Sequence, residues 1–220
     1  MAKKTDKRDK QRKILALIFV EGDTEVEFYK KMKEHLRQKN GGRLICQVEI
    51  HNLKGVGQYQ NTAQRIFEKK IKVIYPEDEY RYKIFLCYDT DVFEFAKKPP
   101  VDWGKVVNML KKLGAEEVFR VEAKSSVEDW FLLDIEGLRT FLKLPKKQKL
   151  TGYSGQSGLK QLFLKANKTY IKGIQCAGLV DALDMSVIFP KICGQIHVFC
   201  ETVGMDCSEE KACDTNGWRV

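Results

Sequence analysis

Carboxylates stand directly after two apolar segments of the sequence. Glu21 follows the run ILALIFV, and Asp89 and Asp91 follow the run KIFLCY. If both runs are strands, the two-residue spacing points Asp89 and Asp91 the same way. Acidic residues favour helix N-termini, which accounts for Asp23 but not for Glu21 beside a buried strand. We therefore predict that the catalytic residues are Glu21, Asp89 and Asp91.

A divalent metal ion suits such a group of carboxylates. If the two strands are neighbours, Glu21 and the aspartate pair converge, and they cannot all stay ionised without a cation among them. Oxygen ligands without clustered histidine select Mg²⁺ or Mn²⁺ over zinc. Such an ion can bridge phosphate oxygens and activate a water or stabilise a leaving oxygen. The expected cofactor is therefore Mg²⁺ or Mn²⁺.

The elements that must position these residues alternate between strand and helix. The predicted strands are residues 14–20, 44–50, 83–88 and 117–123, and the predicted helices are residues 24–37, 58–73 and 103–113. Thr24 and Glu27 fit a capping box at the first helix, and Gly22 allows a tight turn before it. The alternation predicts an α/β fold with a mainly parallel sheet covered on both faces. In such sheets, ligands bind beyond the carboxyl ends of the strands.

The chain divides into three parts by composition. We predict a flexible basic arm at residues 1–12, the α/β domain at residues 13–143, and a basic, mostly helical extension at residues 144–220. A length of 220 residues suits one main domain with an extension. No apolar run is long enough to span a membrane, so we expect a cytoplasmic protein without a membrane partner.

The balance of charge favours a polyanionic partner. The net charge is +9 and the isoelectric point is about 9.1, which fits DNA or RNA, although a lysine-rich solvated surface gives the same composition. Lys54 lies in the glycine-bearing segment LKGVGQY, whose spacing matches no nucleotide-binding fingerprint. The candidate phosphate contacts are Lys54, Lys124, Lys160 and Lys172. A homo-oligomer is also compatible with the sequence.

Two segments together resemble a known domain family. The pairing of FVEGDTEVEFY with the later FLCYDTD looks like the TOPRIM domain, which is shared by type II topoisomerases, primases, small ribonucleases and the OLD and RloB-like defence nucleases. The resemblance covers residues 14–143 and implies a Rossmann-like fold. It implies that Glu21, Asp89 and Asp91 are metal ligands or acid–base groups. Glu25 would hold a second metal, because the EGxTE form is similar to that of the OLD and RloB-like groups.

A third segment extends this resemblance. Residues 124–130, KSSVEDW, are similar to the serine-x-x-glutamate-x-tryptophan stretch of RloB-like proteins, which implies that Ser125 and Glu128 join the metal site. The same two residues fit a capping box on the following helix WFLLDIEGL, and both roles can coexist. The 220 residues contain neither the ATPase domain of OLD nucleases nor the tyrosine-bearing partner domain of topoisomerases, so we do not expect strand passage. The resemblance implies a metal-dependent endonuclease of antiviral defence, and it suggests a regulatory partner protein that restrains the enzyme.

Two other readings of the same residues remain open. An apolar strand followed by Asp-Thr-Asp-Val resembles the haloacid-dehalogenase phosphatases, in which Asp89 would be the nucleophile and Asp91 the acid–base. That reading leaves Glu21 unexplained. A non-catalytic nucleic-acid-binding or regulatory module would keep the fold without the chemistry, and it would leave the carboxylates at the strand ends without a role.

Overall fold

A parallel sheet forms the centre of the molecule. The computed structural model describes residues 12–90, 101–123, 126–173 and 176–205. The sheet has the strand order β2-β1-β3-β4, and every neighbouring pair is parallel. The strands are β1 (Lys13–Val20), β2 (Gln47–Asn52), β3 (Tyr80–Asp89) and β4 (Glu117–Ala123). The predicted α/β fold with a mainly parallel sheet is confirmed, and β1 and β3 are neighbours.

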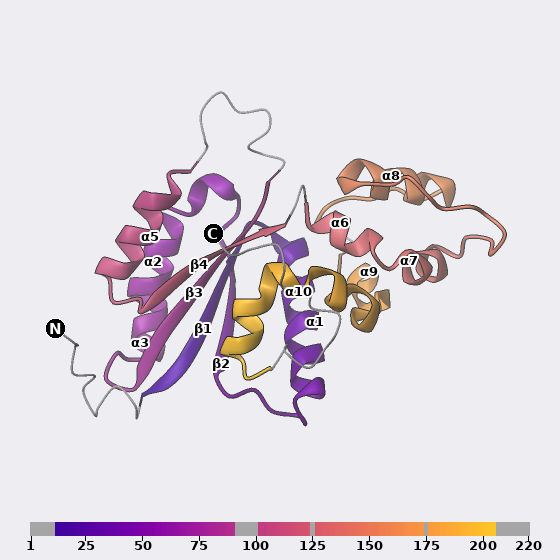
Figure 1. Cartoon of the computed structure of the whole chain (residues 1–220). Helices are drawn as coiled ribbons and strands as arrows, with labels where there is room; N and C mark the ends of the chain where they lie inside the picture. Colours follow the sequence, from indigo (N-terminus) through magenta and orange to yellow (C-terminus); the bar gives the residue numbers. More distant parts are fainter. Residues whose placement is uncertain (1–11, 91–100, 124–125, 174–175, 206–220) are drawn as a thin grey trace.

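Helices cover both faces of this sheet (Figure 1). One face carries α2 (Thr62–Ile66), the π-helical turn η2 (Phe67–Ile71), α3 (Lys72–Ile74) and α5 (Trp103–Lys112), and the other carries α1 (Asp23–Lys39) and α10 (Met185–Thr202). Side chains of β1 alternate between the two faces. Leu15, Leu17 and Phe19 pack into the core under α2, η2 and α5, whereas Ala16, Ile18 and Val20 pack into the core under α1 and α10. A strand buried on both faces is apolar throughout, which explains the run ILALIFV.

Two predicted elements differ from the observed ones. The strand predicted at residues 44–50 begins three residues later, because Ile45 N donates to Val203 O at 3.2 Å and the ladder with β1 starts at Gln47. The helix predicted at residues 58–73 begins only at Thr62, after a 3₁₀ turn (Val56–Gln58), and it contains the π turn η2 between α2 and α3. The apolar spacing predicted the buried face but not the change in winding.

Beyond β4 the described chain is helical. The elements are α6 (Val127–Leu132), α7 (Ile135–Leu142), α8 (Gly155–Lys165) and α9 (Cys176–Ala182), followed by α10. The predicted single helix WFLLDIEGL is two helices, because Asp134 caps α7 through Gly137 N at 2.9 Å. Its other oxygen accepts from Asp184 N at 2.7 Å, next to the start of α10. Among the described residues, no helix is long and apolar enough to cross a membrane.

Helix α10 returns to the sheet and shares its core. Phe199 packs edge-on against Phe85 of β3, with ring centroids 5.2 Å apart. Helix α9 is tied to α1, because Lys31 Nζ donates to the carbonyls of Val180 at 2.8 Å and Asp181 at 2.6 Å. Residues far beyond position 143 therefore complete one face of the α/β layer.

This shared core makes a testable prediction about cooperativity. Phe199 is 2% exposed, so Phe199→Ala should lower the free energy of unfolding by about 3–5 kcal/mol. The control is Val187→Ala on the same helix, where a side chain 37% exposed should change it by about 0.5 kcal/mol or less. Urea unfolding followed by circular dichroism measures both. A separate early transition in Phe199→Ala, with the main transition unmoved, would show that α10 does not belong to this core.

Candidate active site

The carboxyl ends of β1 and β3 bring two of the predicted acidic residues together. The strand register places Phe19 opposite Leu86, and Glu21 and Asp89 follow at the same edge. Glu21 Oε1 accepts a hydrogen bond from Asp89 N at 3.0 Å. Just inside this edge, the buried Tyr59 hydroxyl donates to the carbonyls of both strands, at Phe19 and Cys87. The two strand ends are thus held side by side by a side chain as well as by the ladder.

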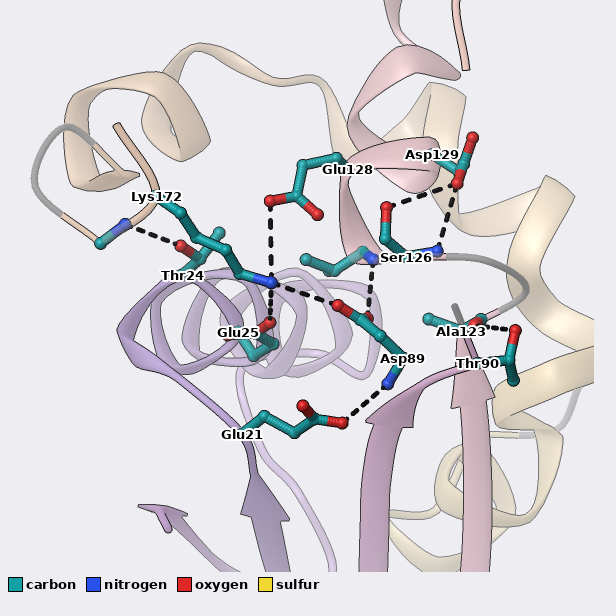
Figure 2. Close-up of polar contacts among 12 residues, drawn as sticks. Glu21, Thr24, Glu25, Asp89, Thr90, Ala123, Ser126, Glu128, Asp129 and Lys172 are labelled. Atoms are coloured by element: carbon teal, nitrogen blue, oxygen red, sulfur yellow. Dashed lines mark hydrogen bonds and ion pairs between the residues drawn. The ribbon is translucent and has the colours of Figure 1, made fainter. Parts of the chain in front are cut away.

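Two helices add further carboxylates to this edge (Figure 2). Glu25 lies in the first turn of α1, and Glu128 lies in the first turn of α6. Glu25, Asp89 and Glu128 are 3%, 4% and 0% exposed, whereas Glu21 is only partly buried. Asp89 Oδ1 accepts from Val127 N at 2.9 Å, so Asp89 also satisfies one free N–H of α6.

A single ammonium group lies among the three buried carboxylates. Lys172 Nζ is 2.9 Å from Glu25 Oε1, 3.1 Å from Asp89 Oδ2 and 3.8 Å from Glu128 Oε1. Lys172 belongs to the connection between α8 and α9. The same connection reaches the site twice more, since Tyr170 OH donates to Glu128 Oε1 at 3.0 Å and Gly173 N donates to Thr24 Oγ1 at 3.1 Å.

Burial and mutual repulsion shift the pKa values of the acidic groups. Burial, followed by the charge of Asp89, raises the pKa of Glu21 to about 8. Burial raises the pKa of Asp89 to about 7, with Lys172 opposing and Glu25 and Glu128 adding to the rise. Although burial lowers the pKa of Lys172, the three carboxylates raise it well above its usual range. The lysine therefore stays charged, while Glu21 and Asp89 change protonation near neutral pH.

The N-terminal capping of helix α1 differs from the predicted one. Helix α1 has Gly22 as its N-cap with no side-chain cap, so the predicted Thr24–Glu27 capping box is wrong. The backbone of Gly22 is extended (φ −150°), a conformation open to any residue, so glycine is not needed here for the tight turn that we predicted. A Cβ at this position would lie 2.8 Å from Glu25 Oε2, so glycine leaves space for that carboxylate.

The capping box predicted for Ser125 and Glu128 is shifted by one residue. Ser126 is the N-cap of α6, and Asp129 Oδ2 accepts from Ser126 N at 3.2 Å. Asp129 Oδ1 also accepts from Gly155 N at 2.6 Å, which ties α6 to the start of α8. Because Asp129 does the capping, Glu128 is released from that role and points into the acidic cluster.

The predicted site residues divide into three groups. Glu21, Glu25, Asp89 and Glu128 come together with Lys172. Lys54 lies beside the cluster, in a left-handed conformation (φ 66°), where its ammonium pairs with Asp23 at 3.1 Å and remains 71% exposed. Lys160 is an exposed residue of α8 and forms no ion pair with these carboxylates. The predicted site residues Asp91, Lys124 and Ser125 lie outside the described residues.

Sequence reasoning missed several supporting residues. Thr24 and Tyr170 hold the lysine-bearing connection, yet Tyr170 lies 42 residues from its partner Glu128 and no pattern links them. Lys172 was predicted as a phosphate contact and not as the partner of the carboxylates. The sequence does contain a signal for Asp129, because Ser126-x-x-Asp129 fits a capping box as well as Ser125-x-x-Glu128 does.

The donor set fits a hard divalent cation. The available side-chain atoms are carboxylate oxygens, and Glu25 Oε2 and Glu128 Oε2 are buried with no hydrogen-bond donor among the described residues. Within the described part of the chain, no three potential ligands are arranged to hold a metal ion as they stand. The ammonium of Lys172 occupies the centre of the cluster, so a metal ion there requires its departure.

No family model, curated protein or solved structure matches the chain in comparisons with known proteins.

The raised pKa of Glu21 predicts how stability depends on pH. Between the ordinary value of 4.5 and about 8, the folded protein holds a proton that the unfolded chain releases. The stabilisation of the folded state by this proton is complete at low pH and is lost as pH rises through about 8. Glu21→Gln cannot ionise, so its unfolding free energy in chelator should fall less steeply from about pH 5 to about pH 9.

Urea titrations of the two proteins across this range give the comparison. Glu27→Gln serves as the matched control, because Glu27 lies on α1 and pairs with Lys30 at the surface, 2.9 Å away. Parallel curves for the wild type and Glu21→Gln would refute the proposed burial of a proton at Glu21.

Proposed function

We propose that this protein is a cytoplasmic, divalent-metal-dependent nuclease that hydrolyses phosphodiester bonds in DNA or RNA. The observation that carries the proposal is the group of four carboxylates at one edge of the parallel sheet, three of which are at most 4% exposed. Burying acidic groups costs stability, and such a cost is usual where the groups serve a site. The resemblance to TOPRIM nucleases and the net charge of +9 support the same conclusion.

Each residue has a role in the proposed site. Glu25, Asp89 and Glu128, together with Asp91 and Ser125, would hold Mg²⁺ or Mn²⁺. When bound, the ion would neutralise phosphate charge and lower the pKa of a water molecule. Glu21 makes no ion pair with Lys172, and in the metal-free protein burial and the charge of Asp89 raise its pKa to about 8. Its second oxygen, Oε2, is therefore suited to take a proton from water or give one to the leaving oxygen near neutral pH.

The basic residues would serve the polyanion. Lys54 is 71% exposed beside the acidic edge, so its ammonium can exchange Asp23 for a phosphate. Lys124 and Lys160 are candidates for the same task on sequence alone. A phosphate contact for Lys172 requires that it first leave the carboxylates. The resemblance to defence nucleases supports an antiviral role, with a partner protein that restrains cleavage.

Neutral substitutions in the cluster test this function. Glu21→Gln, Asp89→Asn and Asp91→Asn should each fold and bind polynucleotide, yet cleave it on the order of 100-fold more slowly or worse. The shape of each side chain is kept while a negative charge that holds metal or carries a proton is lost. Cleavage of single- and double-stranded DNA and RNA, with Mg²⁺ or Mn²⁺ and then with chelator, measures the effect, and Glu27→Gln is the active control.

The same assays separate the rival functions. Hydrolysis of a small phosphate ester by the wild type, lost in Asp89→Asn but kept in Glu21→Gln, would favour the haloacid-dehalogenase-like phosphatase. Binding of polynucleotide without any hydrolysis would favour the non-catalytic module. Full cleavage in excess chelator, or in the Glu21 and Asp89 variants, would refute the proposed nuclease mechanism.

A further inference from the structure

We propose that Lys172 is a built-in counter-ion that closes the acidic cluster, and that a divalent metal ion must displace it and release residues 171–173 from the site. The inference rests on the metal site of the proposed function. It adds that metal binding is coupled to the position of one loop, so the metal-free protein is held closed.

The first support is the geometry of the ammonium group. Lys172 Nζ lies within 3.1 Å of oxygens from both Glu25 and Asp89, and 3.8 Å from Glu128. These oxygens come from α1, β3 and α6, so the lysine lies at the meeting point of three elements (Figure 2). A metal ion bound to the same oxygens would stand within a few ångströms of a second positive charge in a poorly screened environment. The two cations therefore exclude each other.

The second support is the way in which the loop is held. Its backbone and side-chain anchors end on the site itself, since Tyr170 OH donates to Glu128 and Gly173 N donates to Thr24, next to Glu25. Ile171 between them is 44% exposed. Tyr170 is 3% exposed and its ring packs against Phe163, with ring centroids 5.2 Å apart, so it stays in the core and the loop can leave from residue 171 onward. Losing the lysine contact therefore removes the main electrostatic attachment of the loop, without disturbing the sheet.

Competition of this kind has a reciprocal consequence. If the lysine lowers the affinity for metal, bound metal weakens the docking of the loop by the same factor. Only molecules in which the lysine is undocked can bind metal. The apparent affinity is therefore the intrinsic affinity multiplied by the fraction of undocked molecules. A permanent structural ion pair, by contrast, would leave the loop unchanged when metal is added.

Calorimetric titration of Mn²⁺ into the metal-free protein tests the competition. Lys172→Met should bind Mn²⁺ about tenfold more tightly than the wild type, or more, and its melting temperature without metal should be lower. Lys172→Arg keeps the charge and should bind more weakly than Lys172→Met. The control is Lys168→Met, which removes an exposed lysine that lies over the Phe141 ring, 5.5 Å from its centroid, and should leave the affinity unchanged.

Hydrogen exchange of the wild type gives a readout that needs no substitution. Amides of residues 171–173 should exchange faster when Mn²⁺ is added, whereas those of β1 and β3 should not. Equal or weaker Mn²⁺ affinity in Lys172→Met, no Mn²⁺ binding by either protein, or unchanged exchange of the loop would each overturn the inference. Tighter binding in Lys172→Met without nucleic-acid cleavage by any form would instead refute the nuclease and leave the competition standing. Metal-dependent cleavage with equal affinities would refute the competition alone.

Discussion

The parallel pairing of β1 with β3 brings Glu21 and Asp89 together, and the other charged groups of the candidate site gather around this pair. Both strands end at one edge, where Glu21 accepts from Asp89 N at 3.0 Å. Pairing of β3 with β4 then places the start of α6 over Asp89, and Val127 N donates to Asp89 Oδ1 at 2.9 Å. Glu128 follows by one residue. A register slip of β3 would turn Asp89 to the opposite face and dissolve the cluster, so the hydrophobic alternation of the strands also determines the chemistry.

The fold compensates only part of the charge that it buries. Among the described residues, four carboxylates meet one ammonium. Backbone N–H groups, the Tyr170 hydroxyl and protonation favoured by the raised pKa values of Glu21 and Asp89 relieve some of the excess negative charge. In the described part of the chain, Glu25 Oε2 and Glu128 Oε2 are buried without a hydrogen bond, and Glu25 Oε1 has only its ion pair with Lys172. A well-packed apolar edge would stabilise the sheet better. Selection for stability alone does not explain this arrangement, whereas the proposed cation-binding function would account for it.

The sequence predicted what depends on local pattern and missed what depends on distant contacts. Continuous apolar runs identified β1 and β3, and the alternation of strands and helices predicted that they run parallel, whereas their adjacency was assumed from the sequence and is seen only in the sheet order. Glu21 and Asp89 were therefore found from residue type and position alone. The one-residue shift of the capping box to Ser126 was not decidable, since two overlapping patterns satisfy the same rule. The ion pair of Lys172 with Asp89 spans 83 residues, and only the docking of the α8–α9 connection makes it.

Packing holds the carboxylates of the site more firmly than the ammonium group of Lys172. Asp89 belongs to an inner strand of the sheet. The helices that carry Glu25 and Glu128 are held together by Phe28, whose ring centroid lies 5.4 Å from that of Trp130 and 5.6 Å from that of Phe131. Moving any of these anions would break the core. Lys172 lies on a connection whose neighbour Ile171 is 44% exposed, and about a third of its own side chain (35%) reaches solvent. Since the anions are fixed in the core and the cation is carried by an exposed connection, an exchange of cations is the change that this site can make at the least structural cost.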